Sequence, residues 1–149
     1  MIDVLVIIGL NLNMLGRGEL QIYGNHTIAD IMSSLEAKAS GLGLEIAMMQ
    51  SKDESELVNT IQNAQGITRA IPLNLAAYTH TSVALRNAIA IFGEPRVEVH
   101  VSNNCQRESF RRVGLTATVS SDIIVGFGAD SFLLSLDPAN RLFVSNVDV

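Results

Sequence analysis

The stretch "MIDVLVIIGL" (residues 1–10) decides the fold class, because it contains a strand that is apolar on both sides. Between Ile2 and Ile8 only Asp3 is polar, whereas a strand with one face in water alternates apolar and polar residues. A strand covered on both faces is typical of a parallel sheet with helices on each side. The run is too short to span a bilayer and lacks the features of a signal peptide, so we expect a cytoplasmic protein without a membrane segment.

Downstream, short apolar runs alternate with segments of helical period, which is the pattern of repeated βα units. We expect further strands over 44–49, 70–73 and 96–101, and two strand pieces over 115–119 and 123–125 that together count as the fifth strand. Helices are expected over 27–39, 51–65, 82–91 and 129–136, and a short helical turn over 107–112. Thr27 and Ser51 are the expected caps of the first two helices, and Pro138 is expected to end the last one. The tail from about 138 to 149 is strand-like or irregular. This predicts an α/β, flavodoxin-like sandwich with a five-stranded parallel sheet in the order 2-1-3-4-5.

Composition limits the class of protein. At 149 residues and 48% hydrophobic content, the chain is long enough for one well-packed domain over 1–149. The net charge of −5 argues against nucleic-acid binding, which needs a surplus of basic residues. Cys105 is the single cysteine, so the chain forms no intrachain disulfide and suits a reducing compartment.

Polar residues gather where three of the expected strands end, and in this fold class ligands bind at the carboxyl ends of the strands. These segments are rich in Asn, Ser, Thr, His and Arg, which can donate hydrogen bonds to an oxygen-rich ligand. The residues are Asn11, Asn13, Arg17 and Tyr23 after the first strand; Asn74, Tyr78, Thr79, His80, Thr81 and Ser82 after the third; and His100, Ser102, Asn103 and Arg107 after the fourth.

Each of these residues taken alone also has a structural explanation. Taken alone, His80 is better explained by a position beside a helix cap and Tyr23 by packing, whereas His100 is explained as well by a hydrogen bond to a backbone carbonyl as by catalysis. "GFGADS" (126–131) follows a strand, but it lacks the third glycine of a dinucleotide-binding turn. The three histidines of the chain lack the spacing of a metal site, so we expect neither cofactor nor metal.

Two long motifs, "NLAAYTHTSVALRNA" (74–88) and "EVHVSNNCQRESFRR" (98–112), resemble the type II 3-dehydroquinate dehydratases. The resemblance covers nearly the whole chain, because "GLNLNMLG" (9–16), "YGNHTIADI" (23–31), "MQSKDESELVNTI" (49–61) and "IIVGFGADSFLLSL" (123–136) follow the order and spacing of that family. It implies a cofactor-free anti elimination of water from 3-dehydroquinate through an enolate. It also implies a flavodoxin-like subunit that assembles as trimers into a dodecamer.

The resemblance also implies roles for individual residues. Tyr23 would remove the proton next to the ketone, Asn11 would help hold the water that stabilises the enolate, and His100, oriented by Glu98, would protonate the departing hydroxyl. Other residues would bind the substrate. Its ring hydroxyls would be bound by Asn74, His80 and Arg111, and one hydroxyl by Asn87 from a neighbouring subunit. The substrate carboxylate would be bound by the backbone around Val101 and Ser102, and Arg107 would hold the active-site loops together.

The chemistry of a tyrosine base depends on nearby positive charge. Lowering the pKa of a phenol from about 10 to about 7 requires roughly 4 kcal/mol of differential stabilisation, which one or two guanidinium groups in a water-poor site can supply. The family has an arginine where this chain has Gly18. Arg17, flanked by glycines, is expected to take over its role.

Other departures from the family occur at Leu10, at Asn87 in place of an aspartate, and at 113–115. Two functions therefore stay open. The first is a 3-dehydroquinate dehydratase of the shikimate or quinate pathway. The alternative is a catalytically weakened paralogue that binds a related polyol carboxylate as a sensor or interaction module.

Overall fold

Five parallel strands form one sheet in the order β2-β1-β3-β4-β5, as the sequence predicts. The structure is a computed structural model that describes residues 1–14, 16 and 25–145. The strands are β1 (Val4–Ile8), β2 (Ile46–Gln50), β3 (Ile71–Asn74), β4 (Arg96–His100) and β5 (Asp122–Val125). β1 pairs with β2 on one side and β3 on the other, so it lies in the interior of the sheet, and four of its five side chains are buried. This burial explains why its sequence does not alternate.

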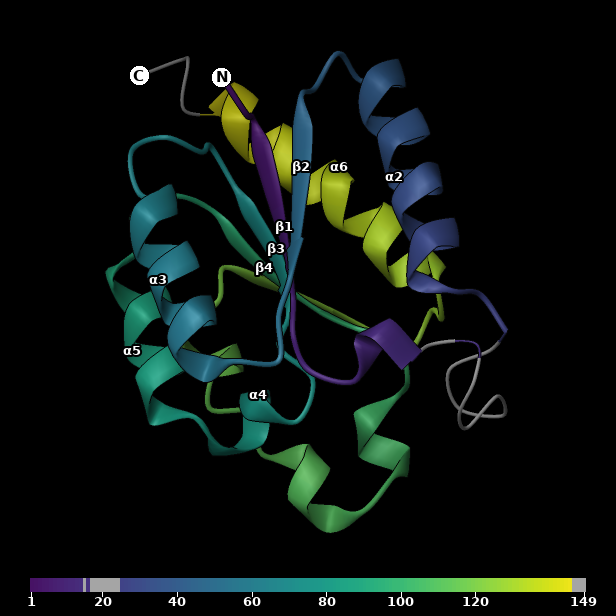
Figure 1. Cartoon of the computed structure of the whole chain (residues 1–149), viewed down its shortest axis with the longest axis vertical. Coiled ribbons are helices and arrows are strands. Elements are labelled where there is room, and N and C mark those ends of the chain that lie inside the picture. The colour runs from purple at the N-terminus through teal and green to yellow at the C-terminus, as the bar shows by residue number, and fades with distance from the viewer. Residues whose placement is uncertain (15, 17–24, 146–149) are drawn as a thin grey trace.

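Two helices cover each face of the sheet (Figure 1). The helices α2 (Ile28–Gly41) and α6 (Asp130–Ser145) pack with one face of β1 and β4 in one apolar cluster, which includes Leu35 and Phe132. The helices α3 (Glu54–Ala64) and α5 (Val83–Ile91) pack over the other face in a second cluster, which includes Leu57 and Phe92. No helix among the described residues is long and apolar enough to cross a membrane.

Helix starts follow the local sequence, with one correction. Thr27 caps α2, and its hydroxyl accepts from the Asp30 amide at 3.2 Å while the Asp30 carboxylate accepts from the Thr27 amide at 2.9 Å. The prediction that Ser51 caps α3 is wrong, because Asp53 is the cap and accepts from the amides of Ser55 and Glu56. The Ser51 hydroxyl instead accepts from the Asp53 amide and donates to Glu56 at 2.5 Å.

The expected strand over 115–119 is absent. This segment instead forms a 3-10 helix, η4 (Ala117–Val119). The Thr118 hydroxyl donates to the Leu115 carbonyl at 2.8 Å and the Ser120 hydroxyl to the Thr116 carbonyl at 2.9 Å. Such local hydrogen bonds satisfy backbone groups that a strand would pair across a ladder.

The last helix does not end at Pro138. α6 continues to Ser145, so residues 138–145 of the expected irregular tail are helical. A proline inside a helix removes one N–H and displaces a carbonyl of the preceding turn. Lys38 of α2 donates to the Leu133 carbonyl at 2.7 Å and to the Asp137 carboxylate at 2.8 Å, which ties the turn before the proline to the neighbouring helix. Burial of Leu136 and Ala139 holds both sides of the proline against the sheet.

Candidate active site

The ends of β1 and β3 are held unusually close together. The Gly9 amide donates to the Asn74 carbonyl at 2.7 Å, directly beyond the register pair Ile8 and Asn74. A Cβ on Gly9 would lie 2.8 Å from the backbone of Leu75, so only glycine fits there. The loops that follow the two strands therefore start from one point at the carboxyl edge of the sheet.

Asn74 is buried, with 3% of its surface exposed, and its side chain is locked by its own loop. Its Oδ1 accepts from the Ala76 amide at 3.0 Å. Ala76 has a φ of 52°, in the left-handed region that non-glycine residues rarely adopt. Because the amide oxygen is used in this turn, the amide nitrogen of Asn74 remains the group with which it can donate to a ligand.

Glu98 and His100 lie two residues apart on β4, so their side chains leave the same face of the sheet. The His100 Nε2 lies 3.2 Å from Glu98 Oε1. Glu98 is fully buried, and His100 is 9% exposed. The geometry places a carboxylate behind an imidazole at a strand end, with Nδ1 as the ring atom left for a ligand. Nδ1 has no hydrogen-bond partner among the residues that the structure describes.

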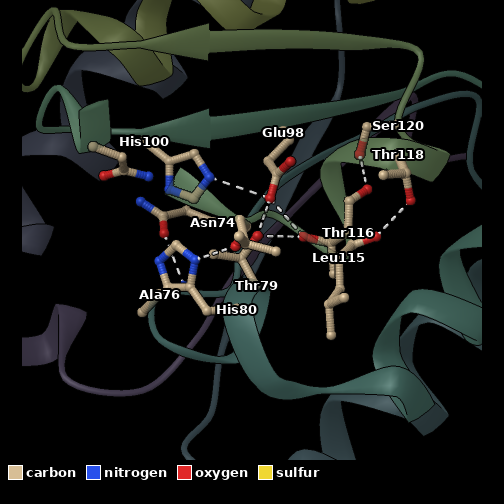
Figure 2. A network of polar contacts seen from close by, with 12 residues as sticks. Asn74, Ala76, Thr79, His80, Glu98, His100, Leu115, Thr116, Thr118 and Ser120 are labelled. Atoms are coloured by element: carbon tan, nitrogen blue, oxygen red, sulfur yellow. Dashed lines mark hydrogen bonds and ion pairs between the residues drawn. The ribbon is translucent and has the colours of Figure 1, made fainter. Parts of the chain in front are cut away.

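Two threonine hydroxyls complete the surroundings of Glu98 (Figure 2). Thr79 of α4 (Tyr78–Thr81) and Thr116 both donate to Glu98 Oε1, the latter at 2.5 Å. Burial by itself would raise the pKa of Glu98, but the hydrogen bonds from His100, Thr116 and Thr79 and the charge of His100 bring that pKa below its ordinary value. Glu98 is therefore an anion at neutral pH and can stabilise the imidazolium form of His100.

His80 lies on α4 with a defined tautomer. Its Nδ1 lies 2.7 Å from the Val113 carbonyl, which can only accept, so this nitrogen carries the proton and Nε2 of the neutral ring is an acceptor. The ring also contacts Phe110 edge-on, with centroids 6.3 Å apart. These two contacts fix the orientation of the ring.

The segment after β4 carries polar groups on two short 3-10 helices, η2 (Asn104–Gln106) and η3 (Ser109–Arg112). The Ser102 hydroxyl is 9% exposed, accepts from Arg107 at 3.3 Å and lies 3.3 Å from Asn104 Oδ1. The carbonyl of Val101 accepts from the amide of Gly128. The amide groups of Val101 and Ser102 donate no hydrogen bond within the described part of the chain.

Arg111, at the end of η3, is held by its own turn. Its Nε donates to Glu108 at 2.7 Å, and its guanidinium lies 5.0 Å from the centroid of the Phe110 ring. The predicted substrate-binding arginine therefore has a counterion and an aromatic support in the absence of substrate.

The structure joins some of the predicted site residues by contacts and leaves others apart. Glu98 contacts His100, and Ser102 contacts Arg107. Asn11 is exposed after β1, with a φ of 65°, and Asn87 is exposed on α5, where it accepts from Arg86. Arg17 and Tyr23 lie outside the described residues.

Sequence reasoning missed Thr116, which it placed in a strand. Thr79 was noticed only as a polar loop residue or possible cap. No local signal identifies either as a partner of Glu98, because they lie 19 and 18 residues from it in the sequence.

Comparisons with known proteins show the family of the chain. A family model described as Dehydroquinase class II matches residues 2–140. The chain is 50% identical to the 3-dehydroquinate dehydratase of Geotalea daltonii over 133 residues, which cover 89% of this chain and 92% of that protein. It is also 50% identical to the 3-dehydroquinate dehydratase of Prochlorococcus marinus over 135 residues, 91% of each chain.

Solved structures agree with these relatives. The type II dehydroquinase of Butyrivibrio crossotus superposes with a TM-score of 0.91 at 35% identity, covering 93% of this chain and 97% of that one. A 3-dehydroquinate dehydratase-like protein from Bifidobacterium longum superposes with a TM-score of 0.73 at 26% identity, covering 97% of this chain and 99% of that one. The five-stranded order, the buried Glu98–His100 pair and these matches lead to one conclusion: the chain belongs to the class II dehydroquinase family.

Proposed function

We propose that this chain is a 3-dehydroquinate dehydratase, which eliminates water from 3-dehydroquinate to give 3-dehydroshikimate. The observation that carries the proposal is the buried Glu98–His100 pair at the carboxyl end of β4. A leaving hydroxyl needs a proton, and an imidazolium held by a buried carboxylate is a suitable donor. The substrate is inferred from the family to which the chain belongs.

The reaction divides between a base and an acid. Tyr23, as the phenolate, takes the proton next to the ketone, and the electron pair of that C–H bond forms the enolate. The enolate then collapses, the C–O bond of the hydroxyl breaks, and the leaving oxygen takes the Nδ1 proton of His100 to become water. Arg17 lowers the pKa of Tyr23, and Asn11 helps hold a water on the enolate oxygen.

Substrate contacts follow from the hydrogen-bonding groups that the described chain leaves unused. The amide nitrogen of Asn74 and the guanidinium of Arg111 donate to ring hydroxyls, and His80 Nε2 accepts from one. The amides of Val101 and Ser102 bind the carboxylate, since neither is used within the described chain. Arg107, which donates to Ser102, holds the adjoining loops.

The proposal also covers how the subunits assemble and where in the cell the protein is located. We expect trimers arranged as a dodecamer in the cytoplasm, with Asn87 of one subunit reaching the site of the next. The exposed side chains of Ile123 on the edge strand β5 and of Phe127 beyond it support a covered surface in that region. Sedimentation of the purified protein would contradict the proposal if it gave only monomer.

The direct assay adds 3-dehydroquinate and follows the enone absorbance of the product. The chain has two tyrosines, which offers a matched pair of variants. Tyr23→Phe should abolish turnover, whereas Tyr78→Phe should keep it, because the Tyr78 hydroxyl donates to the Lys52 carbonyl at 2.9 Å and has a structural role. Absence of product from folded, oligomeric wild-type protein would reject the proposed function. Substrate binding without turnover would instead favour a paralogue that binds a related polyol carboxylate.

A further inference from the structure

Glu98 receives its hydrogen bonds on one oxygen only. The His100 Nε2 and the hydroxyls of Thr79 and Thr116 all meet Oε1, and the two hydroxyls also contact each other. Oε2 is buried and has no partner among the described residues. A carboxylate can only accept, so all three groups act on the same negatively charged atom.

Thr116 has no contact with solvent, since its exposed fraction is 0%. Its backbone is separately fixed, because its carbonyl accepts from the Ser120 hydroxyl and the neighbouring Leu115 amide donates to the Thr79 carbonyl. The segment would therefore keep its path without the Thr116 hydroxyl. What the hydroxyl adds is a donor to Glu98.

The charged surroundings of the pair are simple. The hydroxyls that reach Glu98 come from α4 and from the segment before η4, and its register partners on β3 and β5 are Leu73 and Ile123. His100 is the one titratable group that contacts Glu98 within the described residues, and Glu98 is the one charged group there that contacts His100. The donors on Oε1 thus compete with the imidazolium for the same negative charge.

We infer that Thr116 is a positioning residue for the proton donor. Its hydroxyl, together with that of Thr79, holds Glu98 Oε1 against His100 Nε2 and takes up part of the carboxylate's charge, so that His100 releases its Nδ1 proton more readily. The effect on turnover rests on the proposed function, but the effect on the acidity of His100 does not. Thr116 touches no substrate and acts through Glu98.

The test compares Thr116→Val, which removes the hydroxyl at nearly constant shape, with Thr116→Ser, which keeps it. Thr118→Val is the matched control, because its hydroxyl lies in the same turn but donates to the Leu115 carbonyl. Titration of His100 is followed by NMR of the imidazole in the ligand-free protein. Without the Thr116 hydroxyl, more of the carboxylate's negative charge faces the imidazolium. The NMR titration of His100 should therefore move to higher pH in Thr116→Val, by no more than the roughly one to two pKa units that correspond to one hydrogen bond to a charged group, and stay unchanged in the other two.

Kinetics give the second readout. In Thr116→Val the pH-independent kcat should fall about three- to tenfold and the basic limb of the pH profile should move to higher pH, while KM stays within about twofold. Thr116→Ser should restore both. Thr79→Val removes the other hydroxyl and should shift the His100 pKa in the same direction, which keeps the inference testable if Thr116→Val does not fold.

An unchanged His100 pKa in the folded valine variants would overturn the inference. An equal shift in Thr118→Val would also overturn it, because the effect would then come from the turn itself. If the wild-type protein has no dehydratase activity, the proposed function fails, but the NMR titration still decides this inference.

Discussion

Gly9→Ala should lower the free energy of unfolding and reduce activity, because the added Cβ would clash with the backbone of the next strand end. The added Cβ would lie 2.8 Å from the carbonyl carbon and oxygen of Leu75, about 0.6 Å short of the 3.4 Å at which ordinary contact begins. The opposing atoms are backbone, so no side chain can turn away. Overpacking of this kind costs about 1–3 kcal/mol. Alanine also lowers the conformational entropy of the unfolded chain relative to glycine, which stabilises the folded protein by about 0.4–1 kcal/mol. The free energy of unfolding should therefore fall by about 1–2 kcal/mol in total.

The catalytic effect should be larger than the stability effect. Gly9 and Asn74 are joined by a hydrogen bond of 2.7 Å, so separating the two strand ends moves a proposed substrate-binding residue. A displacement approaching 1 Å in a site can reduce the rate about 10²-fold, and we expect a loss of that order in kcat/KM.

Urea unfolding and the dehydratase assay measure both effects, and Gly41→Ala is the control. Gly41 is the last residue of α2, and an added Cβ there would meet nothing within 4 Å. It should stabilise the protein by about 0.5–1 kcal/mol with unchanged activity. Wild-type stability and kcat/KM in Gly9→Ala would refute the reasoning, because the clash would then be absorbed without moving the strand ends.

Three further predictions concern other parts of the molecule. Arg17→Ala should collapse turnover in the absorbance assay, because we expect this guanidinium to lower the pKa of Tyr23, and an unchanged rate would reject that role. Ser82→Ala should cost about 1–2 kcal/mol in urea unfolding, since the buried hydroxyl accepts from the Leu85 amide at 2.9 Å and also donates to Glu54. Glu98 has a folded pKa below its ordinary value, so the stability that it contributes is present above about pH 4.3 and is lost as the pH falls through the folded pKa. Thermal unfolding between pH 6 and 3 should therefore show a smaller acid-induced loss in Glu98→Gln than in wild type, and equal losses would contradict the assignment.

Much of the fold was predictable because its signals are local. The apolar run of β1, the Thr27 capping box and the Ser82 cap each act within a few residues, and the structure contains all three. The errors arose where distant groups compensate a local signal. Lys38 of α2 ties the turn before Pro138 to a neighbouring helix, and the buried Leu136 and Ala139 pack on both sides of the proline, so the helix continues where the sequence predicts its end.

The sequence by itself indicated the parallel sheet, whose order is the usual one for this fold class, and the resemblance to the family implied that Glu98 orients His100. The two side chains share a face because they lie two residues apart on one strand. Only the tertiary structure decided what surrounds that pair. Thr79 and Thr116 reach Glu98 from 19 and 18 residues away on either side, and hydrogen bonds between such distant side chains leave no periodicity or spacing in the chain. The acidity of the proposed proton donor therefore depends on contacts that exist only once the segments beyond β3 and β4 have packed together.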